Sequence, residues 1–155
     1  MLWKIESSVH IQSYSKWYIN AHVNGGRNGW WRITGFYGNP EASKREESWK
    51  LLKFLHQRSQ LPWMVVGDLN EIIGRVRKGS GIRLAKQMEI FRDAIDVCGL
   101  RDLGCVGSKF TWRYTKRDGT QIRERLDHAL VSKDWSDMFP NARVFHPANS
   151  TSNHS

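Results

Sequence analysis

The sequence predicts an α/β (α+β) layered sandwich, and three observations support this fold class. Short segments with alternating apolar residues precede a helix-like segment within the first 60 residues. The run "LPWMVVG" is continuously apolar, which is typical of a strand covered on both faces. The 155 residues are 39% hydrophobic and contain no internal repeat. We therefore expect one domain over residues 1–155 that mixes antiparallel hairpins with at least one buried central strand.

The first forty residues predict three strands. Residues 9–15, 17–23 and 30–38 are rich in aromatic and β-branched residues, and "NGGRNG" between the last two is a turn signal. Asn39 and Pro40 follow as the expected N-cap and first position of a helix.

The predicted helix carries the acidic "EASKREE" near its start and should end before Pro62. Its expected apolar face consists of Trp49, Leu51, Leu52, Phe54 and Leu55. The buried strand of residues 61–67 comes next, so the chain is expected to pass from a surface helix into the centre of a sheet.

The second half predicts another helix, then strands. Leu84, Met88, Phe91 and Ile95 lie at helical spacing, and Gly99 is the expected stop. Residues 109–114 and 123–132 are expected strands joined by the turn "KRDGT". A short helix near residues 134–138 and a strand at residues 142–146 complete the domain.

Composition narrows the partners and the compartment. The formal charge of +9 favours polyanions, with nucleic acid first among them. Cys98 and Cys105 form no disulfide framework and no metal-ligand spacing, so they are expected to be small packed residues without a disulfide partner. No signal peptide or membrane-spanning run is present in this sequence. An intracellular location is therefore expected, the nucleus included, with no targeting signal legible.

Polar residues interrupt apolar segments at three places. Asp68 and Asn70 alternate at the end of the central strand and could face one cleft, although Gly-Asp also opens many turns. Asp127 lies in "RERLDHALV", where a salt bridge with Arg125 is the alternative interpretation. His154 lies in the polar terminus "TSNHS", where a solvated side chain is the ordinary expectation.

The loop "GRVRKGSGIR" is basic and punctuated by glycine. It does not match a Walker-type phosphate loop, because Lys78 precedes Gly79 instead of following the second glycine. Its cationic side chains, Arg75, Arg77 and Lys78, are candidates for contacts with a phosphate backbone.

In this order, five segments resemble the endonuclease/exonuclease/phosphatase superfamily, which includes DNase I-like nucleases. The segments are "ITGFYGNP", "GDLNEI", "GSKFTW", "RLDHALVS" and "SNH". Their wording is closest to the endonuclease segment of plant LINE-type (non-LTR) retrotransposons, whose fourth box reads "RLDRALVS". The resemblance implies a DNase I-like two-sheet fold lacking its N-terminal strands and helix. The chain would then be a partial domain that consists of the C-terminal two-thirds of the complete one.

The resemblance also implies a magnesium-dependent phosphodiester hydrolase that acts on DNA. Asp68 would activate the attacking water, and Asn70 and Tyr37 would contact the scissile phosphate. Asp127 would orient His154, which would bind the phosphate or exchange a proton. Weaker implied candidates are Trp112 and Arg125, for contacts with the substrate.

Two departures from the family pattern imply an impaired site. The family's Asn box and metal-binding Glu would precede Met1, and apolar surface would be exposed where the missing strands would pack. Asn153 stands where the family has a metal-binding Asp, so the site loses a negative charge and magnesium should bind weakly. The alternatives are therefore a weak or inactive enzyme, a non-catalytic remnant that binds nucleic acid, and a pseudogene product.

Overall fold

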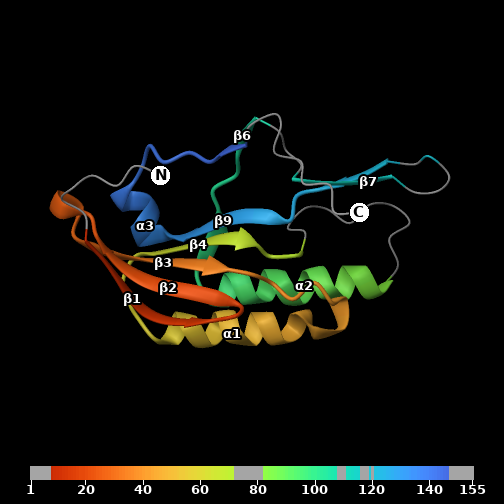
Figure 1. Ribbon diagram of the computed structural model, residues 1–155, viewed down its shortest axis with the longest axis horizontal. Coiled ribbons are helices and arrows are strands. Elements are labelled where there is room, and N and C mark those ends of the chain that lie inside the picture. The colour runs from red at the N-terminus through yellow and green to blue at the C-terminus, as the bar shows by residue number, and fades with distance from the viewer. Residues whose placement is uncertain (1–7, 72–81, 108–110, 116–118, 120, 147–155) are drawn as a thin grey trace.

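The computed structural model describes residues 8–71, 82–107, 111–115, 119 and 121–146. Its strands are β1 (Ser8–Ser15), β2 (Tyr18–Asn24), β3 (Trp30–Phe36), β4 (Trp63–Asp68), β5 (Leu100–Asp102), β6 (Val106–Gly107), β7 (Trp112–Thr115), β8 (Gln121–Glu124), β9 (Asp127–Ser132) and β10 (Phe145–His146). Its α-helices are α1 (Arg45–Gln57), α2 (Ile82–Val97) and α3 (Lys133–Met138), with short 3-10 turns η1 (Gly26–Asn28) and η2 (Ala42–Lys44). Figure 1 shows their arrangement.

A mixed six-stranded sheet organises the domain. The strand order is β1-β2-β3-β4-β9-β5, and within it β3 and β4 run parallel while every other neighbouring pair is antiparallel. The crossover from β3 to β4 contains α1, as a parallel connection requires. Two small sheets, β6 with β10 and β7 with β8, lie outside this sheet. The combination of mixed sheet and helices confirms the predicted α/β (α+β) class.

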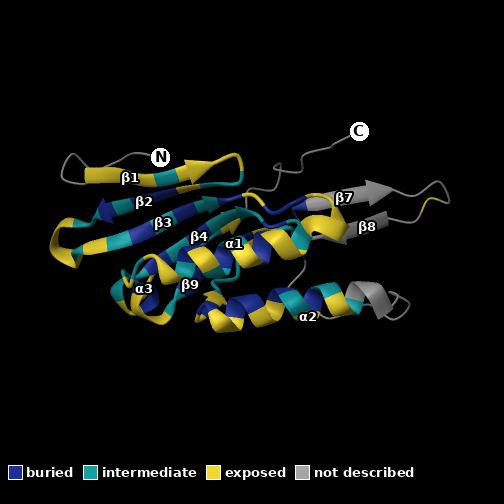
Figure 2. Cartoon of the chain, turned by 90° about the horizontal axis from the view of Figure 1, so that it is seen from below, coloured by how far each residue is buried: buried dark blue, intermediate teal, exposed yellow. Residues whose placement is uncertain are grey.

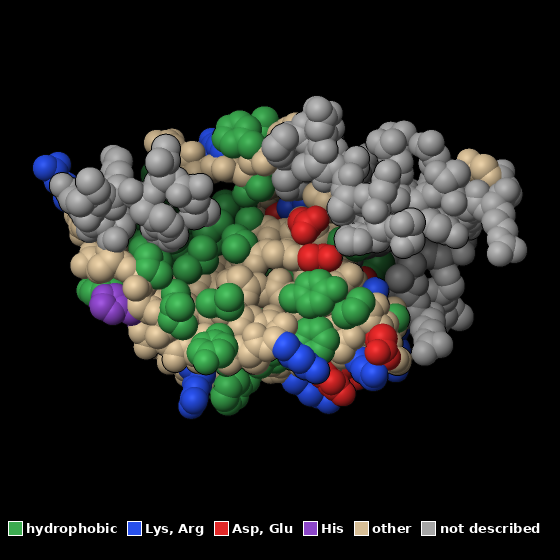
Figure 3. All heavy atoms as spheres, in the orientation of Figure 1, with side chains coloured by type: hydrophobic (Ala, Val, Ile, Leu, Met, Phe, Trp, Pro, Cys, Tyr) green, Lys and Arg blue, Asp and Glu red, His purple; other side chains and the backbone are tan. Residues whose placement is uncertain are grey.

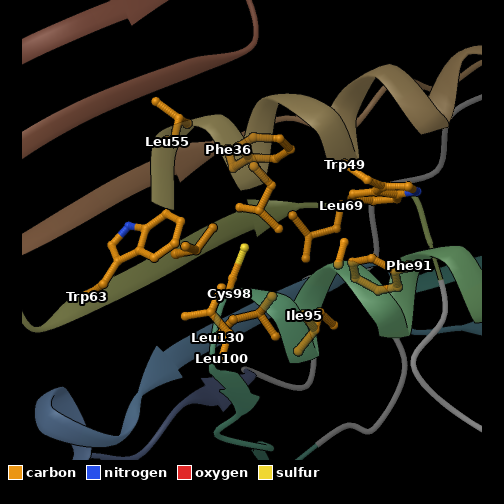
Figure 4. Close-up of a cluster of buried hydrophobic side chains, with 13 residues drawn as sticks. Phe36, Trp49, Leu55, Trp63, Leu69, Phe91, Ile95, Cys98, Leu100 and Leu130 are labelled. Carbon is orange, nitrogen blue, oxygen red and sulfur yellow. The ribbon is translucent and has the colours of Figure 1, made fainter. Parts of the chain in front are cut away.

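The helices α1 and α2 cover one face of the six-stranded sheet (Figure 2). Between them and the sheet lies the main hydrophobic core, shown in Figure 4. Its members are Phe36, Trp49, Leu52, Leu55, Trp63, Val65, Leu69, Phe91, Ala94, Ile95, Cys98, Leu100 and Leu130. Burial of each large aliphatic or aromatic side chain stabilises the fold by about 1.5–3 kcal/mol. The central β4 therefore supplies the buried strand that "LPWMVVG" predicted.

The opposite face of the sheet is partly open. Figure 3 shows hydrophobic side chains gathered on it. The exposed fractions are 66% for Ile11, 78% for Tyr14 and 56% for Ile19, all on β1 and β2. Further along the sheet, Trp31 packs edge-on against Trp135 of α3, so α3 covers only one part of this face. Exposed apolar surface was an expectation of the sequence, and the structure contains it on β1 and β2.

Most element predictions are confirmed, and three need correction. Helix α1 begins at Arg45 and not after Asn39, because the backbone of Glu41 is extended (ψ 114°) and a 3-10 turn, Ala42–Lys44, comes before the α-helix. Phe54, predicted to be on the apolar face of this helix, is 49% exposed. The strand expected over residues 123–132 divides into β8, in a hairpin with β7, and β9, in the six-stranded sheet. The chain between β8 and β9 therefore passes from the β7–β8 hairpin into the six-stranded sheet.

The end of α2 follows the prediction. Met88, Phe91 and Ile95 are buried, and Gly99 follows the helix with a φ of 61° in the left-handed region that glycine adopts without strain. Among the helices described, none has the length and apolar character needed to cross a membrane.

Candidate functional site

Three segments meet at one edge of the six-stranded sheet. Because β3 and β4 are parallel, their carboxyl ends lie at the same edge, and the antiparallel β9 begins there. Asp68 is the last residue of β4, and it pairs directly with Asp127, the first residue of β9. Directly opposed residues of antiparallel strands share a face, so the two carboxylates are neighbours. Both follow the side-chain alternation of Val66, on the face opposite the helices.

The two carboxylates differ in their surroundings. Asp68 is partly buried, whereas Asp127 is exposed. Burial raises the pKa of the Asp68 carboxyl above its ordinary value, and the charge of Asp127 adds to the rise. The N–H of Asn70 opposes it by donating to the Asp68 Oδ1 atom (2.9 Å). Asp68 is therefore a carboxylate that binds a proton or a cation more readily than a solvated one.

Two glycines allow the ends of β3 and β4 to come into contact. A Cβ atom on Gly38 would lie 2.1 Å from the Leu69 carbonyl oxygen, and one on Gly67 would lie 2.0 Å from the Phe36 carbonyl oxygen. Both obstacles are backbone atoms, so neither position has room for a side chain. The Gly residues of "FYG" and "VGD" thus bring the Tyr37 segment against the Asp68 segment.

Asn70 lies just beyond β4 and not within it. Its φ of 53° is in the left-handed region, which Asn tolerates better than most residues. The side-chain Nδ2 atom donates to the Gly38 carbonyl oxygen (2.8 Å), and the Gly38 N–H donates to the Asp68 carbonyl oxygen (2.8 Å). Simple strand alternation, which the sequence suggested for Asp68 and Asn70, is therefore wrong at Asn70. A turn and not a strand places its amide beside β3.

Tyr37 follows β3 at the same edge. Its side chain is 44% exposed and stacks on Trp17, with ring centroids 6.0 Å apart. The Tyr37 N–H donates to the Trp17 carbonyl oxygen (2.8 Å). Tyr37 is thus fixed at its backbone and through its ring while remaining accessible to a ligand.

Asp127 is held at its backbone by a threonine. The Thr111 Oγ1 atom accepts from the N–H groups of both Leu126 (3.1 Å) and Asp127 (3.2 Å). Leu126 also accepts the Leu69 N–H at its carbonyl oxygen (2.9 Å), which joins this segment to the end of β4. Thr111 belongs to the segment "GSKFTW" that the sequence singled out. The residue types alone did not indicate that Thr111 holds the backbone of Asp127.

Arg125 pairs with a residue that the sequence did not indicate. Its Nη2 atom lies 2.5 Å from the Asp102 Oδ1 atom, and its Nε donates only to the backbone oxygen of Asp127 (3.3 Å). The salt bridge considered between Arg125 and the Asp127 carboxylate is therefore replaced by one with Asp102. This pairing leaves the Asp127 carboxylate to face Asp68.

Asp102 and His128 form a buried polar cluster behind the two carboxylates. Burial alone would raise the pKa of Asp102, but bonds from His128 and from the Gly104 N–H, with the charge of Arg125, lower it overall. His128 is 6% exposed. Sequence reasoning missed both residues, since a single Asp or His in an apolar segment carries no spacing signal. Glu71, expected to be structural, is buried and pairs with Arg45 (3.3 Å).

Several candidate residues cannot be placed. The loop residues Arg75, Arg77 and Lys78 and the terminal Asn153 and His154 lie outside the described residues. Trp112 lies on β7, but its side chain is not described. Within the described part of the chain, no three His, Cys, Asp or Glu side chains form a group that could hold a metal ion. The described oxygen donors nearest to such a role are the paired Asp68 and Asp127.

Comparison with known proteins identifies the fold. No protein-family model matches the chain, and no curated protein sequence matches it significantly. Among solved structures, the endonuclease domain of TRAS1, a telomere-specific non-LTR retrotransposon, superposes with a TM-score of 0.57 at 15% identity over 88% of this chain and 60% of that one. The 3′ phosphatase NExo from Neisseria, bound to a product DNA hairpin, gives a TM-score of 0.55 at 18% identity over 81% and 58%.

A third structure, a β-hairpin deletion mutant of β toxin from Staphylococcus aureus, gives a TM-score of 0.54 at 17% identity over 90% of this chain and 54% of that one. The chain thus has the DNase I-like fold that these structures share. It spans 54–60% of the length of these three structures.

Proposed function

We propose that the chain is a phosphodiester hydrolase domain of the DNA endonuclease type, derived from a LINE-type retrotransposon. The observation that carries the proposal is the meeting of Asp68, Asp127, Asn70 and Tyr37 where β3, β4 and β9 come together. Three of the five ordered boxes that resemble the plant LINE-type endonuclease pattern contain these residues. The shared fold with the TRAS1 endonuclease domain and with a DNA-bound phosphatase supports the same class of reaction.

Asp68 is suited to take a proton from the attacking water. Its pKa is raised, chiefly by burial and further by Asp127, so its carboxylate is a stronger base than a solvated one. Its orientation is fixed by the Asn70 N–H. An amide nitrogen carries two hydrogens, and Asn70 uses one for the Gly38 carbonyl oxygen. The other would hold an oxygen of the scissile phosphate, with the half-exposed Tyr37 beside it.

The remaining roles follow from the resemblance. Asp127 would orient His154, and Arg125 would add positive charge beside the site, although its pairing with Asp102 reduces that charge. The loop cations Arg75, Arg77 and Lys78, together with Trp112, would contact the nucleic acid.

A divalent cation, magnesium by the family pattern, would neutralise charge that develops on the phosphate. Asp68 and Asp127 fit such an ion in part, because two opposed carboxylates offer oxygen ligands and their mutual repulsion would be relieved. Asn153 would add an amide oxygen but no charge. We therefore expect weak metal affinity and slow turnover.

Nicking of supercoiled plasmid DNA in magnesium tests the proposal. Asp68→Asn should lower the nicking rate by about 100-fold or more, since it removes the general base while preserving size. Asp137→Asn is the matched control, because Asp137 is an exposed carboxylate on α3 that pairs with Lys133. Equal rates for the wild type, Asp68→Asn and Asp137→Asn would reject a catalytic site at Asp68.

The alternative is a remnant that binds nucleic acid without cleaving it. The charge of +9 and the amide at Asn153 favour it. It predicts DNA affinity that falls steeply with salt, without magnesium-dependent nicking. A pseudogene product that does not fold alone is the remaining possibility, and a cooperative thermal transition of the isolated chain would exclude it.

A further inference from the structure

His128 occupies the position next to Asp127 on β9 but faces the other side of the sheet. Its backbone pairs with Gly67 of β4, and its ring lies 6.4 Å from the Phe91 ring of α2, between centroids. The side chain is 2% exposed. A buried imidazole inside the core needs partners for both ring nitrogens, since an unsatisfied polar group there costs about 1–3 kcal/mol.

Both ring nitrogens of His128 have partners. The Nδ1 atom lies 3.1 Å from the Asp102 Oδ2 atom, and the Nε2 atom lies 3.1 Å from the main-chain carbonyl oxygen of Glu71. The Glu71 carbonyl oxygen and the Asp102 carboxylate both only accept, so the two bonds form together when each ring nitrogen carries a hydrogen and donates it. Asp102 is itself held by the Gly104 N–H (2.7 Å) and by Arg125. His128 thus connects a well-fixed carboxylate to the segment that follows β4.

That segment contains the proposed site. Residues 68–71 include Asp68 and Asn70, and the segment is fixed at the front by the Gly38 contacts. At its end, Arg45 holds the Glu71 side chain and His128 holds the Glu71 main chain. The bond from His128 thus fixes the main chain one residue beyond the left-handed Asn70, whose amide is held on the other side by Gly38.

We propose that His128 is a positioning residue, whose hydrogen bonds to Asp102 and to the Glu71 carbonyl oxygen hold Asp68 and Asn70 in the arrangement that the site requires. The inference rests on the proposed function. It deepens that function by adding support from the core side of the sheet.

Two near-isosteric substitutions separate the two bonds. His128→Gln places an amide N–H near the position of the Nε2 atom and can keep the bond to Glu71. His128→Asn places one near the Nδ1 atom and can keep only the bond to Asp102. Both variants lose one bond and the imidazole packing on Phe91, so each serves as the stability control for the other. Urea unfolding measures the global loss in each.

The decisive measurement is amide hydrogen exchange, which needs no catalysis. The Asn70 N–H is bonded to the Asp68 Oδ1 atom and reports on the turn, whereas the Val65 N–H lies within β4. Exchange at Asn70 relative to Val65 should rise by about 10-fold or more in His128→Asn and by less than about 3-fold in His128→Gln. Equal ratios in the two variants would overturn the positioning role.

Plasmid nicking provides the functional arm. If the wild type nicks, kcat should fall about 10-fold or more in His128→Asn with KM nearly unchanged, and His128→Gln should recover most of it. Loss of kcat in both variants in proportion to their stability would count against the inference. If the wild type does not nick, the proposed function fails by its own test, and the exchange ratio still decides whether His128 positions the turn.

Discussion

Gly38→Ala tests whether the close approach of the segments that follow β3 and β4 builds the site. The added Cβ atom would lie 2.1 Å from the Leu69 carbonyl oxygen and 2.6 Å from its carbonyl carbon. Ordinary contact begins at 3.4 Å, so the two backbone segments must separate by about 1.3 Å. Such a shift lengthens two hydrogen bonds of 2.8 Å, from the Gly38 N–H to Asp68 and from the Asn70 amide to Gly38. Each is worth about 0.5–1.5 kcal/mol, so the loss of both should lower the free energy of unfolding by about 1–3 kcal/mol.

Gly35→Ala is the matched control, because the nearest atom to its added Cβ is the Ile19 carbonyl oxygen at 4.0 Å. Urea denaturation followed by tryptophan fluorescence should place this control within about 1 kcal/mol of the wild type. Gly38→Ala should also lose plasmid nicking, because the Asn70 amide would no longer be held beside β3. Equal unfolding free energies for the two alanine variants would refute the steric reasoning.

Three further predictions concern charge, thiol reactivity and the open face. Asp68→Asn should raise the free energy of unfolding at pH 7, because burial raises the folded-state pKa of Asp68 and the charged carboxylate therefore costs stability. The gain should vanish in urea curves well below the ordinary pKa of 3.8, where the carboxyl is protonated in both states. In a Cys105→Ser background, Cys98 should react with a thiol reagent only as the chain unfolds, since burial raises its pKa to about 11, and rapid reaction of the native protein would contradict this. The double variant Ile11→Lys, Ile19→Lys should lower concentration-dependent association in sedimentation velocity with little change in Tm, because both side chains are mostly exposed. Unchanged association would show that this face of the sheet does not mediate it.

Local patterns predicted much of the fold. The apolar run before Asp68 was enough to indicate a central strand, although β4 is buried at Trp63 and Val65 and only half-buried at Met64 and Val66 on its other face. Helical spacing and Gly99 were enough to place α2 and its end, since the glycine adopts the left-handed conformation that ends a helix. The start of α1 was not predicted correctly, because the extended backbone of Glu41 separates Asn39 from the helix.

The sequence predicted only part of the candidate site. Its ordered boxes indicated Asp68, Asn70, Asp127 and Tyr37, and the structure brings the segments that carry them to one edge of the sheet. The sequence did not predict the supporting residues Asp102 and His128. Asp102 is 26 residues from His128 in sequence, and their contact exists only because β5 pairs with β9.

By itself, then, the sequence indicated most of the strands and helices, with β5 and β6 missed, and it gave the basic charge. It also located the polar residues that interrupt apolar segments. These features depend on residue type and spacing along the chain. Tertiary structure alone decided that Arg125 pairs with Asp102 and not Asp127, and that His128 reaches the Glu71 carbonyl oxygen. Those contacts depend on strand register and on the tight passage at Gly38 and Gly67. Both are set by packing among segments far apart in the sequence, where local periodicity carries no information.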